Sequence, residues 1–232
     1  MSRKLAIITA RAGSKRIPNK NVRDFCGKPI ISYGIEAAKE SKIFDTIMVS
    51  TDSEEIAQIG LKYGAEVPFF RSEKNSDDYA TTRDVIMEVL ERYKGKGEEF
   101  DVICCIYPTA PFITAELLQQ ALQLLSNDES YHVYPVVRYS FPPQRGVLVD
   151  NGYIDLWQPK YQPCRSQDLE PIYHDCGMFY FYDVKEYFRT NGQIVNKVKP
   201  IILPETLVQD IDTEDDWKIA ELKYKLWKKE SL

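Results

Sequence analysis

The amino-acid sequence predicts an α/β fold with a doubly wound, mainly parallel sheet and a β-rich excursion in the second half of the chain. Short runs rich in β-forming residues alternate with segments whose apolar residues recur at helical spacing, and this alternation is typical of βαβ units. The pair Asn151-Gly152 between two β-forming runs indicates a tight hairpin. The 232 residues, 44% of them hydrophobic, suffice for one well-packed domain over residues 1–232.

The first half of the chain is predicted to supply most of the parallel sheet. Strands are expected at residues 5–9, 46–50, 67–70 and 102–107, and helices at residues 30–41, 54–63 and 82–93. Helices of this kind cover both faces of a parallel sheet, and ligands bind beyond the carboxyl ends of its strands. We therefore expect a binding site in the loops after Thr9, Ser50 and Tyr107.

The second half of the chain departs from this alternation. The expected elements are a helix at 115–126, a strand at 132–137, a hairpin of strands 146–149 and 153–157, a strand at 178–182, a short helix at 184–188, a strand at 200–203 and a closing helix at 214–228. Residues 139–176 thus form a β-rich segment outside the core. Its part 139–163 is rich in aromatic residues and proline, which is typical of a subunit contact or of a plain surface lobe.

Composition excludes several classes of protein. The net charge of -5 argues against nucleic-acid partners, and no apolar run approaches the ~20 residues needed to span a membrane. The apolar stretch after Arg3 ends at Arg11, so we expect no secretory signal peptide. Five cysteines without a CxxC pair are typical of reduced thiols and indicate a cytoplasmic protein. A cysteine nucleophile would need a base, and the candidates are His132 and His174.

The most informative segment is the loop that follows the first predicted strand, in the sequence LAIITARAGSKRIPNKN. It carries four cations and no acidic residue: Arg11, Lys15, Arg16 and Lys20. Gly13 and Ser14 allow a tight backbone path. Cations and free backbone N–H groups at a sheet edge favour binding of a polyanionic phosphate chain. The loop matches neither GxxxxGK[ST] nor GxGxxG, and the alternative interpretation is a solvated basic turn.

A second segment, QDIDTEDDW, precedes the closing helix. In extended backbone, Asp210 and Asp212 point to the same side, with Ile211 turned into the core. Two carboxylates of this kind suit Mg²⁺, which completes its shell with water and substrate phosphates. The alternative is helix capping by Thr213 or Asp212, with Asp216 in the first turn. Capping, however, does not require both Asp210 and Asp212.

Two further clusters carry weaker signals. Residues 77–82, DDYATT, stand just before a predicted helix, where hydroxyl and backbone groups read a base edge or simply cap the helix. Residues 164–169 are followed by Tyr173-His174-Asp175. A guanidinium such as that of Arg165 can make a bidentate contact with a substrate carboxylate, although an arginine in a polar loop is more often a surface residue.

Together these motifs resemble those of the CMP-sialic acid synthetase (acylneuraminate cytidylyltransferase) family. The matching segments occur in the family's order between Ile7 and Trp217: ITARAGSKRIPNKN, VSTDSEEIA, DDYATT, YPTAPF, RSQDL and QDIDTEDDW. The resemblance implies a Rossmann-like nucleotidyltransferase fold. It also implies transfer of CMP from CTP to the anomeric hydroxyl of a nine-carbon keto-sugar (nonulosonic) acid, Mg²⁺ as cofactor, and a homodimer.

The same resemblance implies roles for individual residues. The CTP side would comprise Ala10, Arg11, Gly13, Ser14, Lys15, Lys20, Asn21, Ala80 and Thr82, and the sugar-acid side Tyr107, Arg165, Gln167, His174 and Asp175. Arg11 and Lys20 would stabilise the charge that develops at the α-phosphorus. Asp210 and Asp212 would hold Mg²⁺, and one of them would accept the proton of the attacking hydroxyl.

Departures from the family pattern lie on the sugar side. Tyr107-Pro108-Thr109-Ala110-Pro111-Phe112 stands where sialic acid synthetases usually have Gln before Pro-Thr-Ser-Pro-Leu-Arg, and His174-Asp175-Cys176-Gly177 stands in place of Arg-x-Asn-Gly. These changes favour the pseudaminate branch, with N-acetylneuraminic and legionaminic acid as alternative substrates. The remaining alternatives are a catalytically silent nucleotide- or partner-binding domain and a dinucleotide oxidoreductase, which the lack of GxGxxG disfavours.

Overall fold

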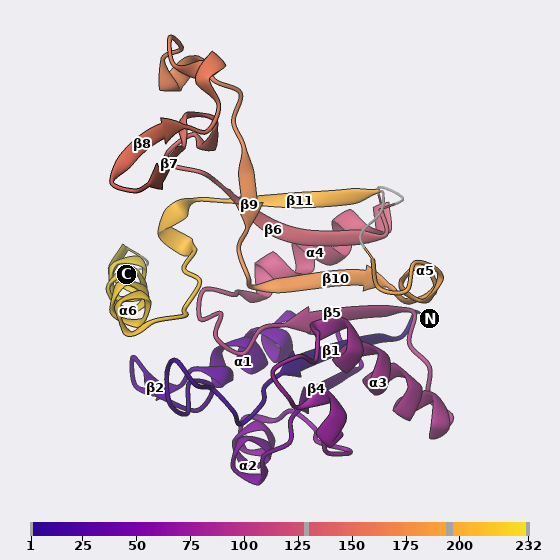
Figure 1. Cartoon of the computed structure of the whole chain (residues 1–232). Helices are drawn as coiled ribbons and strands as arrows, with labels where there is room; N and C mark the ends of the chain where they lie inside the picture. Colours follow the sequence, from indigo (N-terminus) through magenta and orange to yellow (C-terminus); the bar gives the residue numbers. More distant parts are fainter. Residues whose placement is uncertain (1, 128–129, 194–196, 231–232) are drawn as a thin grey trace.

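The computed structural model describes residues 2–127, 130–193 and 197–230. Its centre is a seven-stranded sheet with the strand order β11-β6-β10-β5-β1-β4 and with β9 paired to β6 (Figure 1). The strands are β1 (Lys4–Thr9), β4 (Thr46–Ser50), β5 (Val102–Ile106), β6 (His132–Arg138), β9 (Tyr173–Asp175), β10 (Phe179–Asp183) and β11 (Val198–Leu203). Only β9 and β10 run against the others. The predicted mainly parallel sheet is therefore confirmed.

Helices cover both faces of this sheet, which confirms the predicted double winding. The helices are α1 (Ile31–Ser41), α2 (Glu54–Tyr63), α3 (Thr82–Gly95), α4 (Ala115–Asn127), α5 (Val184–Arg189) and α6 (Glu214–Glu230). The alternation along β1 explains the two layers, because Ala6 and Ile8 join the core under α1 and α4 while Leu5 and Ile7 join the core under α3 and α5. Buried on both faces, β1 reads as a continuous apolar run.

Residues 67–70 do not form the predicted strand. Glu66 makes an isolated parallel bridge with Met48, and the ladder stops there. Pro68 has no N–H to donate to a ladder, so a proline in this run favours an irregular edge. The segment ends with the Arg71 N–H donating to the Thr51 carbonyl at 2.7 Å. Residues 67–70 therefore lie close to the carboxyl end of β4 but do not pair with it as a strand.

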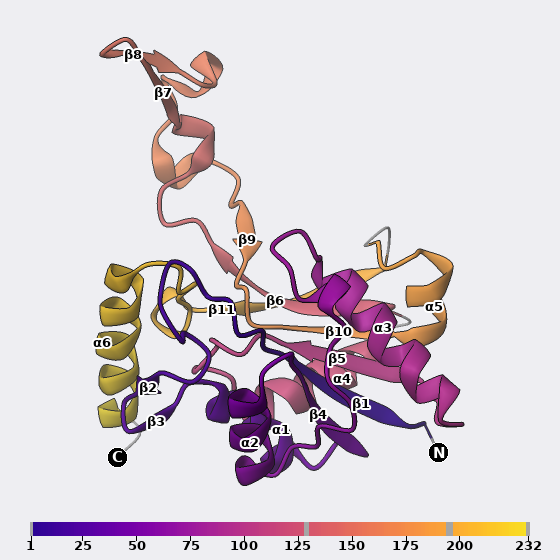
Figure 2. The same cartoon turned by 60° about the horizontal axis from the view of Figure 1, so that its bottom comes forward.

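The β-rich excursion is confirmed and stands away from the sheet as an arm (Figures 1 and 2). Its hairpin joins β7 (Val147–Asp150) to β8 (Tyr153–Leu156) in an antiparallel pair. Asn151 (φ 49°) and Gly152 (φ 82°) both have positive φ, as the predicted two-residue turn requires. The sequence did not indicate the short pair β2 (Asp24–Phe25) and β3 (Lys28–Pro29), nor β9.

Short 3₁₀ turns connect several of these elements. They are η1 (Glu73–Asn75), η2 (Pro143–Arg145), η3 (Pro159–Tyr161), η4 (Ser166–Asp168) and η5 (Glu205–Leu207). Three of them, η2, η3 and η4, belong to the arm, and η5 leads from β11 toward α6. In the described part of the chain, no helix combines the length and the apolar character needed to cross a membrane.

His132 is a buried titratable group at the start of β6. It is 3% exposed, and its ring lies 4.2 Å from the Tyr182 ring and 4.9 Å from the Tyr134 ring, measured between centroids. Neither ring nitrogen has a hydrogen-bond partner among the residues that the structure describes. Burial lowers the pKa of His132 from 6.5 to about 4. The folded protein therefore keeps this imidazole neutral at pH values where an unfolded chain would protonate it.

We expect this histidine to make folding pH-dependent. Because the unfolded chain binds the proton near pH 6.5 and the folded chain near pH 4, stability falls as the pH drops through this window, by about 3 kcal/mol in total. Urea denaturation at pH 7.5 and pH 4.5 measures the effect. His132→Phe should lose less stability than the wild type between these pH values, and an equal loss in both proteins would contradict the assignment.

Candidate active site

A cavity of about 650 Å³ lies beyond the carboxyl ends of β1 and β5, where the sequence predicted a binding site. It brings together side chains from three separate predicted clusters. Its lining includes Arg11, Ser14, Lys15, Arg16, Lys20 and Asn21 after β1, Ala80 and Thr82 at the start of α3, and Tyr107 after β5. The topology of the sheet thus assembles residues almost a hundred positions apart into one site.

The loop after β1 is held in place by hydrogen bonds at both ends. Asp52, after β4, accepts a hydrogen bond from the Ala12 N–H at 2.9 Å. Asn21 is buried, and its Nδ2 donates to the Arg11 carbonyl at 2.8 Å. Ala10 is buried below the loop with its N–H donating to the Ser50 carbonyl at 3.0 Å. Both ends of this loop are therefore anchored to the core of the protein.

Ala10 and Gly13 are not among the residues that line this cavity. Ala10 is fully buried, and a Cβ at Gly13 would meet no atom within 4 Å. A contact between either residue and CTP remains a prediction.

Each of the loop's four cations contacts an acidic side chain from a distant segment. The Arg11 guanidinium lies 3.0 Å from Asp78 and also donates to the Asp77 carbonyl at 2.7 Å. Lys15 pairs with the same Asp78 carboxylate, and its hydrogen bond lowers the pKa of Asp78. Such exposed pairs contribute little stability. The cations are therefore available to a phosphate chain of higher charge.

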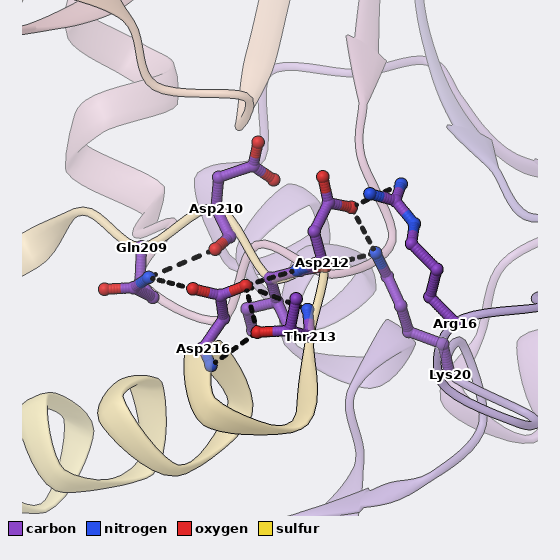
Figure 3. Close-up of polar contacts among 8 residues, drawn as sticks. Arg16, Lys20, Gln209, Asp210, Asp212, Thr213 and Asp216 are labelled. Carbon is purple, nitrogen blue, oxygen red and sulfur yellow. Dashed lines mark hydrogen bonds and ion pairs between the residues drawn. The ribbon is translucent and has the colours of Figure 1, made fainter. Parts of the chain in front are cut away.

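The other two cations meet Asp212. Arg16 Nη2 lies 2.8 Å and Lys20 Nζ 3.5 Å from the Asp212 Oδ1, and both side chains point toward this carboxylate (Figure 3). Lys20 also donates a hydrogen bond to the Ile211 carbonyl. The basic loop and the carboxylate edge, separated by about 190 residues in sequence, are therefore in direct contact.

Asp210 and Asp212 project to the same side of the extended segment before α6 (Figure 3). Ile211 between them is fully buried, as the alternation of extended backbone requires. Desolvation and the charge of the neighbouring Asp212 raise the pKa of Asp210. A cation placed against the two carboxylates would relieve this repulsion.

Helix capping accounts for the neighbouring residues. The Asp216 N–H donates to Thr213 Oγ1 at 3.2 Å, and the Asp216 carboxylate accepts from the Thr213 N–H at 2.8 Å and from its hydroxyl at 2.7 Å. This reciprocal pair is a capping box at the start of α6. Capping therefore involves Thr213 and Asp216 and leaves the side chains of Asp210 and Asp212 for another role.

The donor set at Asp210 and Asp212 fits Mg²⁺. Two carboxylates supply hard oxygen ligands, and Mg²⁺ usually takes one or two of these together with water and substrate phosphates. Within the described ranges, no group of three or more His, Cys, Asp and Glu side chains is arranged to hold a metal.

Tyr107 and Asp175, predicted on the sugar side, are linked through Tyr180. The Tyr107 and Tyr180 rings lie 5.2 Å apart, and the Tyr180 hydroxyl lies 2.9 Å from each oxygen of the Asp175 carboxylate. Tyr107 also shares a 3.2 Å hydrogen bond with the Thr82 hydroxyl in the first cavity. His174 lines a second cavity together with Asp210 and Asp212.

Arg165 and Gln167 are not brought to either cavity by the single chain. They lie at the start and in the middle of η4 on the arm, and neither lines the cavities described above. Arg165 instead makes two hydrogen bonds with Asp168, at 2.6 and 3.0 Å. In the single chain the Arg165 guanidinium thus pairs with a carboxylate three residues later on the same arm. Their contact with a sugar acid remains a prediction.

Two further residues of the first cavity, Arg71 and Asp78, were not predicted as site residues. Arg71 is 9% exposed, and its Nε donates to the Ser50 hydroxyl at 3.1 Å. Nothing in the local pattern marks this arginine, because its partner lies on β4. Asp78 could have been predicted, because a loop with four cations and no acidic residue needs acidic partners from another segment.

Comparisons with known proteins agree with this geometry. The sequence profile of a family described as Cytidylyltransferase matches residues 5–202. A pseudaminic acid cytidylyltransferase of Campylobacter jejuni is 40% identical over 223 residues, covering 96% of both chains. A CMP-N,N'-diacetyllegionaminic acid synthase of Legionella pneumophila is 33% identical over 226 residues, covering 94% of both chains. Among solved structures, a CMP:2-keto-3-deoxy-manno-octonic acid synthetase complexed with CTP has a TM-score of 0.68 at 18% identity, covering 98% of this chain and 100% of that chain, and supports the fold.

Proposed function

Since this chain belongs to the cytidylyltransferase family and is a nucleotidyltransferase, we propose that it transfers CMP from CTP to pseudaminic acid and releases pyrophosphate. The family assignment confirms the resemblance seen in the sequence. The observation that carries the choice of acid is the 40% identity, over almost the whole chain, to relatives named as pseudaminic acid cytidylyltransferases. The relative named for a legionaminic acid is less similar, at 33%.

In this proposal the protein acts by positioning and charge neutralisation. The anomeric hydroxyl forms a bond to the α-phosphorus of CTP while the bond between the α-phosphorus and the bridging oxygen breaks, and pyrophosphate leaves with the electron pair. Lys20 and Arg11 stabilise the charge that develops at the phosphorus. The loop holds the triphosphate so that the hydroxyl is oriented for in-line attack. Asp210 or Asp212 accepts the proton of the hydroxyl.

We also propose Mg²⁺ as the cofactor, held by Asp210 and Asp212. When bound, it would neutralise phosphate charge and lower the pKa of the attacking hydroxyl. The Arg16–Asp212 ion pair supports this proposal, because each of its two side chains would bind a different group of the CTP–Mg²⁺ complex. A triphosphate would take over Arg16, and a cation would take over the Asp212 carboxylate.

Pyrophosphate release with each acid tests the choice of substrate. Purified protein, CTP and Mg²⁺ are mixed separately with pseudaminic, N-acetylneuraminic and N,N'-diacetyllegionaminic acid, and kcat/KM is measured for each. We expect the highest value for pseudaminic acid. A higher kcat/KM for another acid would show that this other acid is the preferred substrate, while the proposed type of reaction would stand. CTP-dependent thermal stabilisation without turnover on any acid would instead favour a silent nucleotide-binding domain.

A homodimer is proposed because the arm exposes a large apolar surface. Val149 is 72%, Tyr153 78% and Ile154 67% exposed in the hairpin of the single chain. A contiguous exposed apolar patch of this kind usually marks an interaction site, and a second copy is the partner that is always available. We expect a dimer by analytical ultracentrifugation, and Ile154→Asp should shift it to the monomer. An unchanged sedimentation coefficient would show that the hairpin is a plain surface lobe.

A cytoplasmic location is also proposed. All five cysteines are free in the structure, and Cys104, Cys105 and Cys176 are buried. Free thiols of this kind are usual in a reducing compartment.

A further inference from the structure

Asp78 is an acidic side chain in the lining of the first cavity, which otherwise contains the cations of the basic loop and Arg71. Its carboxylate lies 3.0 Å from Arg11 Nη1 and pairs with the Lys15 ammonium. The hydrogen bond from Lys15, followed by the contact with Arg11, lowers the pKa of Asp78, so this side chain is ionised at neutral pH. A negative charge therefore lies on the cations to which we assign the phosphate chain of CTP.

The two segments that Asp78 joins are each held in place by other hydrogen bonds. The Asp77 carboxylate accepts from the Tyr79 N–H at 2.9 Å and from the Ala80 N–H at 2.8 Å, which fixes the turn before α3. On the other side, Asp52 accepts from the backbone of the basic loop at 2.9 Å. The Asp78 carboxylate makes no further hydrogen bond or ion pair with any residue that the structure describes. It can therefore leave its two cations without loosening either segment.

Asp212, the other carboxylate that contacts the basic loop, lies in a different environment. It lines the second cavity, of about 380 Å³, together with Asp210, and two neighbouring carboxylates suit a bound cation. Asp78 lines the first cavity and has both of its contacts with cations of the loop. An anion held by an arginine and a lysine is in the position of a phosphate group. Asp78 therefore resembles a bound phosphate more than a metal ligand.

We infer that Asp78 takes the place of a phosphate in the free protein and is displaced when a triphosphate binds. This inference rests on the proposed function and adds to it a residue that sets the affinity of the site for phosphates. CTP carries more negative charge than one carboxylate, so it competes successfully for Arg11 and Lys15. After the transfer, Asp78 can return to both cations, which favours the release of pyrophosphate.

The test compares Asp78→Asn with the matched control Glu98→Gln. Glu98 pairs with Arg3 at 2.9 Å, and its side chain is 42% exposed against 43% for Asp78, but it does not line the first cavity. Calorimetry at one fixed Mg²⁺ concentration gives Kd for CTP, pyrophosphate and cytidine. We expect Asp78→Asn to bind CTP and pyrophosphate roughly 2- to 10-fold more tightly than the wild type, the range that follows from removing two exposed ion pairs.

The two controls should show no change. Cytidine has no phosphate and should bind Asp78→Asn and the wild type alike, and Glu98→Gln should match the wild type with all three ligands. Unchanged affinity of Asp78→Asn for CTP would show that the carboxylate does not compete with phosphate. Weaker binding of CTP would show that Asp78 orients the cations in the complex. Either result would overturn the inference, as would equally tighter binding of cytidine.

Ionic strength separates competition between charges from a change in the shape of the site. The two ion pairs of Asp78 are exposed, so salt screens them. The ratio of the wild-type Kd for pyrophosphate to that of Asp78→Asn should therefore fall toward one between about 50 and 500 mM NaCl. A constant ratio would contradict the inference. No sugar acid is present in these measurements, so a wild type without turnover in the pyrophosphate-release assay would refute the proposed function without deciding the binding result.

Discussion

Replacing Lys20 by alanine should lower kcat by about 10²-fold or more, the usual effect of removing one donor that stabilises a developing oxyanion charge. Lys20 is 18% exposed and lies where the basic loop touches the carboxylate edge. Its ammonium contacts the Ile211 carbonyl and Asp212. The substitution therefore removes a positive charge at the junction of the two cavities, where the bond to phosphorus is expected to form.

Lys28→Ala is the matched control for Lys20→Ala. Lys28 is also partly buried, at 29% exposure, and forms an ion pair with Glu36, but it does not line the first cavity. Steady-state turnover at saturating CTP and sugar acid gives kcat for both variants, and urea denaturation gives their stability. Near-wild-type kcat in a folded Lys20→Ala protein would show that Lys20 does not act on the transferred phosphate.

Asp212→Asn should lower kcat about as much as Lys20→Ala does, because it weakens the binding of Mg²⁺. The substitution keeps the shape of the side chain and removes one of the two negative charges that we assign to Mg²⁺. We expect kcat to fall by about 10²-fold and the Mg²⁺ concentration for half-maximal rate to rise, by analogy with the loss of one electrostatic contact. A direct Mg²⁺ titration by calorimetry with CTP present should show weaker binding in the variant.

Asp215→Asn controls for the loss of a negative charge in the same segment. Asp215 is 87% exposed and pairs with Lys218 on the surface of α6. Its Mg²⁺ dependence should match that of the wild type. If Asp212→Asn and Asp215→Asn show the same Mg²⁺ dependence, the carboxylate edge does not hold the metal, and the pair with Arg16 is only a surface contact.

The parts of the fold and site that local pattern determines were predictable. The apolar run of β1 and the cations after it follow one another in sequence, so one short segment specifies both a buried strand and the basic loop that lines the first cavity. The same holds for Asp210 and Asp212, whose common direction follows from extended backbone. The hairpin turn at Asn151-Gly152 is equally local.

The features that the sequence did not indicate depend on contacts between distant segments. The second cavity forms where β6, η5 and α6 come together, and nothing near residue 138 marks Arg138 as part of its lining. Residues 67–70 have a strand-like composition, but Pro68 and the end of the β4 ladder at Glu66 prevent pairing. Arg165 pairs with Asp168 on the arm of the single chain, and its contact with a sugar acid stays a prediction.

The most direct test of the account is a ³¹P NMR spectrum of wild-type protein incubated with CTP, Mg²⁺ and pseudaminic acid. We expect the three triphosphate resonances to disappear and equal amounts of a phosphodiester and pyrophosphate to form, because the bond at the α-phosphorus breaks. No reaction with any of the three acids would contradict the account. CDP and inorganic phosphate would contradict it equally, since they would show that the γ-phosphate is the group transferred or released.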